Sequence, residues 1–222
     1  MPSRLFESYL DLKYLLNRGY RKSVALKFVA NHYKLRKEER HLLARCVFSD
    51  KEIEAREKKR KPIDFVKGKI LAIDGFNVLI TLESVLEGRA ILCEDGLVRD
   101  LKYQRGYKLS EKTEKMLCLL LEFLSKFNPK EIIFLYDKPV SRSGKIAKLT
   151  NEIMKKVGLS GTAKAVEAPD FELKKFEIVA TSDLAVVDKI KYVVDIPQEF
   201  AKSRGIKIKE FKELLKVGRE SY

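Results

Sequence analysis

The spacing of apolar positions changes near residue 65, and this divides the chain into two parts. Before that point apolar residues recur every three or four positions, as at Leu5, Tyr9, Leu12 and Leu16, which is the spacing of one helix face. After it, short continuous apolar runs alternate with helical patterns, which is typical of parallel strands joined by helices. The pattern predicts a three-layer α/β domain with a central, mostly parallel sheet, preceded by a small all-helical region.

The helical region is expected to contain four helices. The first runs from residue 3 to a break at Arg18-Gly19, and the others are predicted at 23–32, 37–48 and 51–61. The sequence Ser49-Asp50-Lys51-Glu52 has the form of a capping box, which begins a helix, and Pro62 ends that helix. These boundaries give a first region of residues 1–62.

The α/β part is predicted to span residues 66–205. Its strands are expected at 69–74, 131–136, 163–167, 177–180 and 192–194. Helices are expected after Asn77, after Ser110, at 146–156, near Pro169 and from Asp183. A hairpin at 91–98 is indicated by the turn Asp95-Gly96, and a separate basic helix is expected at 206–217 within a C-terminal segment of residues 206–222.

Three of the apolar runs end in an aspartate. Asp74 follows the first run, Asp137 follows the second, and Asp183 closes Thr181-Ser182-Asp183 after a third. Because the carboxyl ends of parallel strands meet at one edge of a sheet, these carboxylates are expected to lie together. Such a cluster repels itself unless a cation neutralises it, and oxygen-only ligands favour Mg²⁺ or Mn²⁺.

Each acid also has a purely structural interpretation. Asp74 and Asp137 are in positions where an aspartate commonly accepts hydrogen bonds within a turn. Asp183 and Asp170 each precede a predicted helix, where an aspartate commonly serves as the N-cap. The sequence alone leaves both interpretations open for each residue.

The net charge narrows the choice of partners. The chain carries a formal charge of +14, and residues 1–66 hold 17 Lys and Arg against 9 Asp and Glu. An excess of one sign favours contact with phosphate-rich nucleic acid. Abundant Lys and Glu and only two Gln also suggest a thermophile-like surface. Such a surface explains the high content of charged residues but not the excess of positive over negative charge.

Other classes of protein are disfavoured. No apolar run approaches the roughly 18 residues of a membrane span, and no signal peptide is indicated. No glycine-rich dinucleotide motif follows the first predicted strand. Cys46, Cys93 and Cys118 are widely spaced, which is typical of packed thiols in a reducing cytoplasm. A cytoplasmic protein is therefore expected.

The motifs Asp74-Gly75-Phe76-Asn77 and Thr181-Ser182-Asp183 give the chain a resemblance to a known family. Over about residues 66–200 it resembles the PIN-like nucleases, especially their NYN branch. It also looks like a small archaeal group that has a helical N-terminal extension. The resemblance implies a PIN-like fold and a site in which acids hold one or two divalent ions, which activate water for attack on an RNA phosphodiester.

The resemblance assigns roles to individual residues. Asp74 and Asn77 match the family's first acid and asparagine, Asp137 matches the acid in the middle of the sheet, and Asp183 matches the last acid. Asp170 is the candidate for a further metal ligand. Thr181 and Ser182 are the hydroxyl neighbours that support the last acid.

Basic side chains close to these acids suggest how RNA is held. Lys138, Arg142 and Lys145 follow Asp137 directly and are expected to contact phosphates flanking the site, although a merely solvated loop explains them equally well. The sequence therefore predicts an Mg²⁺- or Mn²⁺-dependent endoribonuclease. The alternative is a non-catalytic RNA-binding adaptor with an incomplete PIN-like site.

Overall fold

The computed structural model describes residues 3–101 and 111–217, and the statements below concern this part of the chain. Its internal contacts divide the chain into two compact units. The first comprises residues 1–58, 88–101 and 208–222, and the second comprises residues 59–87 and 102–207. The predicted helix start at Ser110 lies outside the described residues.

The second unit is built on a five-stranded sheet in which every pair of neighbouring strands is parallel. The strands are β1 (Ile70–Asp74), β4 (Glu131–Asp137), β5 (Gly161–Val166), β6 (Ile178–Ala180) and β7 (Tyr192–Val193). Their order in the sheet is β5-β4-β1-β6-β7. The predicted α/β class with a parallel central sheet is therefore confirmed.

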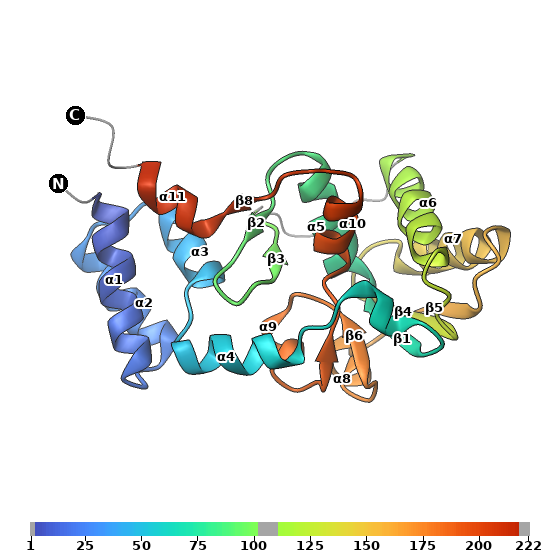
Figure 1. Cartoon of the computed structure of the whole chain (residues 1–222), viewed down its shortest axis with the longest axis horizontal. Helices are drawn as coiled ribbons and strands as arrows, with labels where there is room; N and C mark the ends of the chain where they lie inside the picture. The colour runs from blue at the N-terminus through green and yellow to red at the C-terminus, as the bar shows by residue number, and fades with distance from the viewer. Residues whose placement is uncertain (1–2, 102–110, 218–222) are drawn as a thin grey trace. The chain divides into compact units, whose positions relative to one another are not determined.

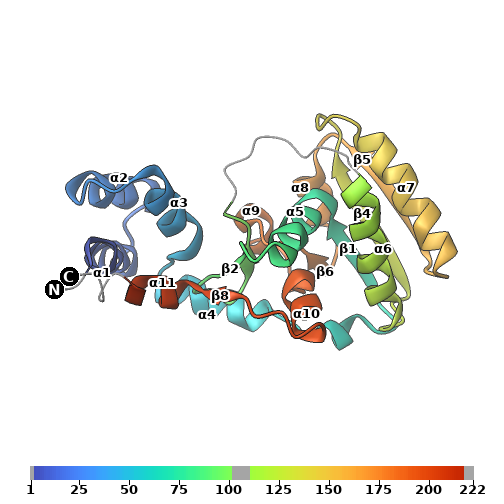
Figure 2. The same cartoon turned by 90° about the horizontal axis from the view of Figure 1, so that it is seen from above.

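Helices cover both faces of this sheet. One layer contains α5 (Gly75–Leu86), α6 (Glu111–Ser125), α7 (Ser143–Lys156) and α10 (Ile196–Ser203), and the other contains α8 (Pro169–Leu173) and α9 (Leu184–Val187). Figures 1 and 2 show the two sets of helices around the strands. A short 3-10 helix, Ile63–Val66, precedes β1. The result is a three-layer domain.

Alternate strand residues form the core beneath the larger helical layer. Ile73 of β1 and Phe134 and Tyr136 of β4 are fully buried in one apolar cluster with side chains of α5, α6 and α7. Ala72 and Leu135, at the intervening positions, are buried outside that cluster. Both sheet faces are therefore covered, which explains why β1 and β4 appear in the sequence as continuous apolar runs.

Helix α10 was missing from the sequence prediction. Asp195 begins it by accepting a hydrogen bond from the backbone N–H of Gln198 at 3.0 Å, and Pro197 occupies its first turn. Proline is tolerated there because the N–H groups of the first turn have no partner within the helix. The Asp-Ile-Pro sequence is thus a helix start.

The first unit contains four N-terminal helices, a hairpin and the C-terminal segment. Its elements are α1 (Arg4–Asn17), α2 (Lys22–His32), α3 (Lys37–Cys46), α4 (Asp50–Lys59), β2 (Ile91–Leu92), β3 (Val98–Arg99), β8 (Lys209–Glu210) and α11 (Phe211–Val217). The predicted hairpin is confirmed, with Gly96 at φ 73° in its turn. The capping box is also confirmed, because Ser49 and Glu52 exchange backbone-to-side-chain hydrogen bonds.

The C-terminal prediction was wrong at its start. Residues Lys209 and Glu210, expected to be helical, form β8, which pairs in parallel with β2. Helix α11 begins only at Phe211, whose buried ring packs edge-on against Tyr9 of α1 at 5.7 Å between centroids. Tertiary pairing has overridden the helical pattern of the local sequence.

Buried charges connect the helices and the hairpin of the first unit. Asp95, 1% exposed, accepts two 2.7 Å hydrogen bonds from Arg99 and one of 3.2 Å from Arg56. The guanidinium groups of both arginines lie over the ring of Phe48. This arrangement pairs two buried cations with one buried carboxylate, and Arg56 also forms an ion pair with Glu52 at 3.6 Å.

No helix in the two described stretches is both long and apolar enough to cross a membrane.

Candidate functional site

The carboxyl-terminal edge of the sheet carries the predicted aspartates. Asp137 ends β4, Asp74 ends β1, and Asp183 follows β6, and these three strands are adjacent. Asp170 lies in the first turn of α8, a helix that contacts both β1 and β4. The order of the strands thus brings four aspartates, separated by up to 109 residues in sequence, to one edge of the sheet.

The turn after β1 depends on a glycine. Asp74 is the N-cap of α5 and accepts a hydrogen bond from the Asn77 backbone N–H at 3.3 Å. A Cβ atom at Gly75 would lie 2.2 Å from Cε1 of Tyr136. That ring is fully buried, and its hydroxyl is hydrogen-bonded to Thr150 at 2.8 Å. Only glycine therefore permits the helix to begin directly after Asp74.

Hydrogen bonds lock this turn to the turn after β6. The Thr181 hydroxyl donates to Oδ2 of Asp74 at 2.9 Å and accepts from the Asp183 backbone N–H at 3.1 Å. Oδ1 of Asn77 accepts from both the backbone N–H and the hydroxyl of Ser182, at 2.8 and 3.1 Å. Thr181, Ser182 and Asn77 therefore fix the positions of the two acids.

Electrostatic repulsion couples the four acids. Burial raises the pKa of Asp74 to about 7, and the charges of Asp183 and Asp170 add to this rise, whereas hydrogen bonds from Thr181 and Asn77 oppose it. The pKa of Asp170 is also raised, by burial first and then by the charge of Asp183, with a smaller contribution from Asp137. Ionising these aspartates at the edge of the sheet therefore costs free energy, and a bound cation would reduce that cost.

The donor set fits a hard divalent cation only in part. Within the described residues, no three His, Cys, Asp or Glu side chains are placed so as to enclose a metal ion. Asp183 also directs one oxygen to the backbone N–H of Ala185, at 2.7 Å, as the N-cap of α9. Mg²⁺, however, commonly uses one or two carboxylates together with water and substrate phosphate, and the oxygen chemistry here suits that mode.

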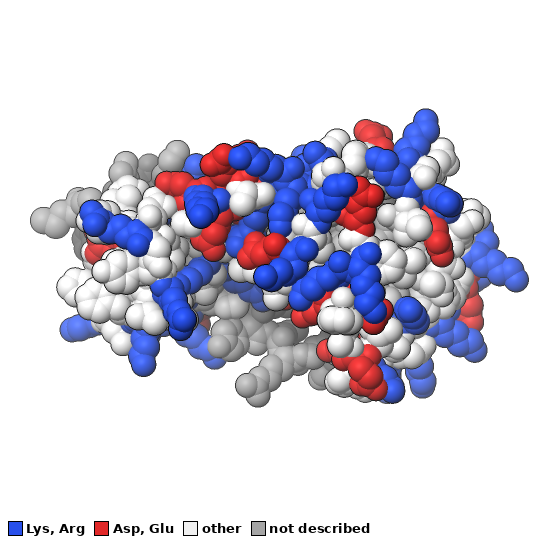
Figure 3. All heavy atoms as spheres, turned by 90° about the horizontal axis from the view of Figure 1, so that it is seen from below, with Lys and Arg blue, Asp and Glu red and all other residues white. Residues whose placement is uncertain are grey.

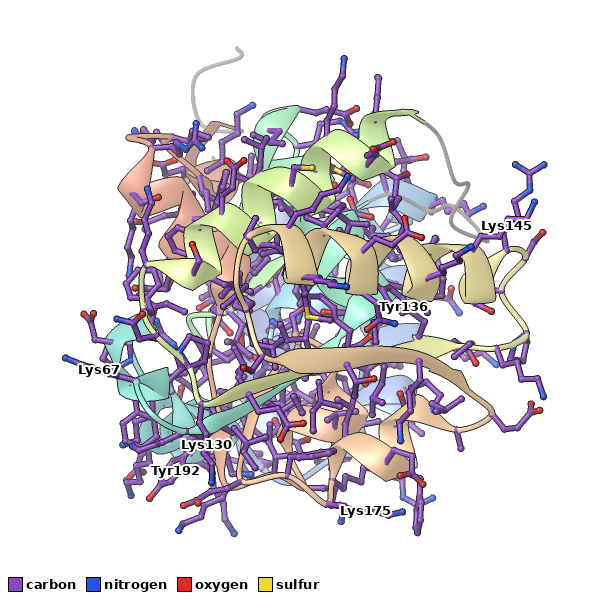
Figure 4. All side chains as sticks on the ribbon, turned by 90° about the vertical axis from the view of Figure 1, so that its right-hand side faces the viewer. Lys67, Lys130, Tyr136, Lys145, Lys175 and Tyr192 are labelled. Atoms are coloured by element: carbon purple, nitrogen blue, oxygen red, sulfur yellow. The ribbon has the colours of Figure 1, made fainter. Side chains whose placement is uncertain are left out.

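The basic residues that follow β4 differ in whether they already have an acidic partner. Lys138 forms an exposed ion pair with Glu167, so much of its charge is already neutralised. Arg142 and Lys145 are exposed at the start of α7, where Arg142 adopts a left-handed φ of 66°. Figure 4 shows Lys145 at the opposite end of the sheet from Lys67 and Lys130, which precede β1 and β4. Arg142 and Lys145 are thus the better placed to meet an anion.

Sequence reasoning found the basic excess of the N-terminal region but missed the exposed aromatic side chains that accompany it on α1, α2 and the turn between them, which together form an aromatic and basic surface. Tyr14, Tyr20 and Phe28 are 57%, 56% and 67% exposed. Residues 12–37 contain eight Lys and Arg but no Asp or Glu, a signal that was available from the sequence. The Arg18 guanidinium lies over the Tyr14 ring at 4.5 Å, and the His32 ring stacks beside Phe28. In the view of Figure 3, Lys and Arg side chains are distributed over the surface, with groups of Asp and Glu among them.

Comparison with known proteins identifies two family matches and one relative. Residues 63–199 match the model of a family described as Domain of unknown function (DUF5616), and residues 4–59 match one described as Protein of unknown function (DUF434). An uncharacterized protein of Methanocaldococcus jannaschii is 48% identical over 193 residues, which cover 85% of this chain and 92% of that protein. No solved structure matches the chain.

Proposed function

The chain belongs to the DUF5616 family, whose description assigns no activity, and we propose from the chemistry of its site that it is a metal-dependent ribonuclease. The observation that carries this proposal is the gathering of Asp74, Asp137, Asp170 and Asp183 at one edge of a parallel sheet. The resemblance of the Asp-Gly-Phe-Asn and Thr-Ser-Asp motifs to those of PIN-like nucleases supports the same conclusion.

Mg²⁺ or Mn²⁺ bound at this edge would act as a Lewis acid on a phosphodiester and lower the pKa of a bound water. Asp74 and Asp183 are the first candidates to hold it, with Asp137 and Asp170 beside them. The protein's own contribution is positional. Thr181 holds one oxygen of Asp74, and Asn77 holds the backbone that carries Asp183. We place this activity in the cytoplasm.

The metal proposal is tested by thermal unfolding. Because a cation would relieve repulsion in the folded state alone, millimolar Mn²⁺ is expected to raise the melting temperature, and Asp74→Asn is expected to remove most of that rise. Glu152→Gln, which changes an exposed acid in the middle of α7, is the matched control and should keep the full rise. Equal rises in the wild type and in Asp74→Asn would place the bound metal elsewhere.

Cleavage is tested separately with single-stranded and structured RNAs in the presence of Mn²⁺. Wild type and Glu152→Gln should cleave, and Asp74→Asn, Asp183→Asn and samples with EDTA should not. Equal cleavage by every variant would show that the activity comes from a contaminant. An absence of cleavage by the wild type, together with RNA binding, would favour the adaptor function.

One observation favours that second candidate. One oxygen of Asp74 and one of Asp183 already accept hydrogen bonds as helix N-caps. Within residues 3–101 and 111–217, no group of three Asp, Glu, Cys or His side chains is arranged to hold a metal ion. A non-catalytic RNA-binding adaptor would need only the basic surface. It predicts RNA affinity that is unchanged by EDTA and by Asp183→Asn.

We propose single-stranded RNA as the partner of the aromatic and basic surface on α1 and α2. Exposed rings offer faces on which bases stack, and the stretch without acids offers cations for phosphates. Phe28→Ala should weaken binding about tenfold or more and leave its salt dependence unchanged, because stacking releases no counterion. Lys27→Glu should weaken binding and also reduce its salt dependence. The slope of log affinity against log salt concentration should become less negative by roughly 0.7 for each phosphate that the variant no longer neutralises.

The control for this experiment is Lys202→Glu, which makes the same change of charge on α10 in the second unit. It should bind RNA nearly as well as the wild type. A fall in affinity in Lys202→Glu equal to that in Lys27→Glu would mean that net charge, rather than this surface, determines binding.

A further inference from the structure

Two cysteines distant in sequence lie side by side in the first unit. Cys46 is the last residue of α3, and Cys93 follows β2 in the hairpin segment. Both side chains are buried, and their sulfur atoms are 2.6 Å apart, so no atom lies between them. Cys118, in contrast, is partly exposed on α6 of the second unit.

The backbone holds both cysteines at this position. The Glu94 backbone N–H donates to the carbonyl of Cys46 at 3.2 Å, and the Cys93 N–H donates to the carbonyl of Leu97 at 3.1 Å within the hairpin. The Glu94 side chain accepts from the Phe48 N–H at 3.1 Å, which adds a second connection between the two segments. The two thiols therefore approach without rearrangement of either segment.

The surroundings of Cys93 favour its thiolate. Burial opposes ionisation, but the hydrogen bond from Cys46 and the nearby charge of Arg99 outweigh it and lower the pKa of Cys93. Arg99 is itself fixed by its two hydrogen bonds to Asp95. Burial raises the pKa of Cys46. The pair thus consists of a thiol that ionises more readily and a partner that retains its proton.

We propose that Cys46 and Cys93 form a structural disulfide that joins the end of α3 to the β2–β3 hairpin. The Cys93 thiolate attacks a low-molecular-weight disulfide and forms a mixed disulfide, releasing one thiol. Cys46 then loses its proton to solvent and attacks the Cys93 sulfur as a thiolate, and the second external thiolate leaves and takes up a proton. Two protein thiols are thereby oxidised while one external disulfide is reduced to two thiols. Because both sulfur atoms are buried in the folded unit, the external disulfide reaches Cys93 while the end of α3 is displaced from the hairpin, in which Arg99 remains beside Cys93.

The bond has a clear physical use in this unit. It closes a loop between residues 46 and 93, and loops of that length restrict the unfolded chain strongly. It also fixes the hairpin that carries Asp95 and Arg99, whose buried charges must remain paired. Disulfides are rare in most cytoplasmic proteins but common in the intracellular proteins of hyperthermophiles. The Lys- and Glu-rich composition of this chain is typical of hyperthermophile proteins.

The first test counts free thiols in the full-length chain. The protein is refolded with oxidised and reduced glutathione, denatured, and labelled with a maleimide–polyethylene glycol reagent. One adduct, at Cys118, is expected without further reduction, and three are expected after reduction. Mass spectrometry should find the peptides of Cys46 and Cys93 linked. Three adducts without reduction would overturn the proposal, as would a linked pair that includes Cys118.

The second test measures thermal unfolding with and without a reductant. Reduction should lower the melting temperature of the wild type by on the order of 10 °C. Cys118→Ser is the matched control and should show the same fall, whereas Cys93→Ser should not respond to reductant. The comparison of oxidised with reduced wild type needs no variant, so it decides the matter even if Cys93→Ser does not fold. An unchanged melting temperature on reduction would refute a structural role.

Discussion

Replacing Asp74 with Asn should stabilise the metal-free protein at alkaline pH. The partly buried carboxyl of Asp74 has a pKa raised from 3.8 to about 7, chiefly by burial and further by Asp183 and Asp170. Between these two pH values the unfolded chain has released a proton that the folded chain retains. The free energy of unfolding therefore falls as pH rises through this window, and above pH 7 the folded protein bears the full cost of the charge.

The size of the effect follows from the pKa shift and from the removal of one hydrogen bond. A rise of about three units corresponds to at most about 4 kcal/mol. Asparagine has one oxygen instead of two, so the hydrogen bond from the Thr181 hydroxyl to Oδ2 is removed, at a cost of about 1 kcal/mol. Because Asp74 is not fully buried, solvent screens part of the charge. We expect a net gain of about 2 kcal/mol at pH 8.5.

The measurement is urea unfolding in EDTA at four pH values from 4 to 8.5. Circular dichroism is the suitable probe because the chain contains no Trp. The gain from Asp74→Asn should vanish near pH 4, where Asp74 is protonated in the folded state and only about half ionised in the unfolded state, and it should grow as pH rises. Glu152→Gln should show little change at any pH. A variant less stable than the wild type at pH 8.5, or a difference independent of pH, would refute the reasoning.

Two further predictions concern the packing around this site and in the first unit. Gly75→Ala should lower the free energy of unfolding by about 3 kcal/mol or more in urea titrations, because its Cβ would overlap the buried Tyr136 ring. Gly144→Ala, within α7 and with no atom near its added Cβ, is the control and should be neutral or stabilise by up to about 1 kcal/mol. Asp95→Asn should lower the free energy of unfolding by about 3–5 kcal/mol in the same measurement, because it removes the negative charge that accepts two hydrogen bonds from the buried Arg99. A decrease of less than about 1 kcal/mol would contradict that account.

The sequence by itself determined the elements whose local pattern has one physical solution. The apolar runs that end at Asp74 and Asp137 are strands because both faces of a parallel sheet are buried. The Ser49–Glu52 capping box and the Asp95-Gly96 turn are equally local, because each is satisfied by hydrogen bonds or backbone angles within a few residues. The aspartates at the strand ends could therefore be expected at one edge before the strand order was known.

Only the tertiary structure decided which segments meet. The strand order puts Asp137 and Asp183 on either side of Asp74, and the packing of α8 adds Asp170. Cys46 meets Cys93, and the charged pair Lys209-Glu210 becomes a strand, for reasons absent from their immediate neighbours. Such contacts join residues tens of positions apart, and their free energy comes from burial and pairing in the assembled fold, so no local pattern of the sequence encodes them.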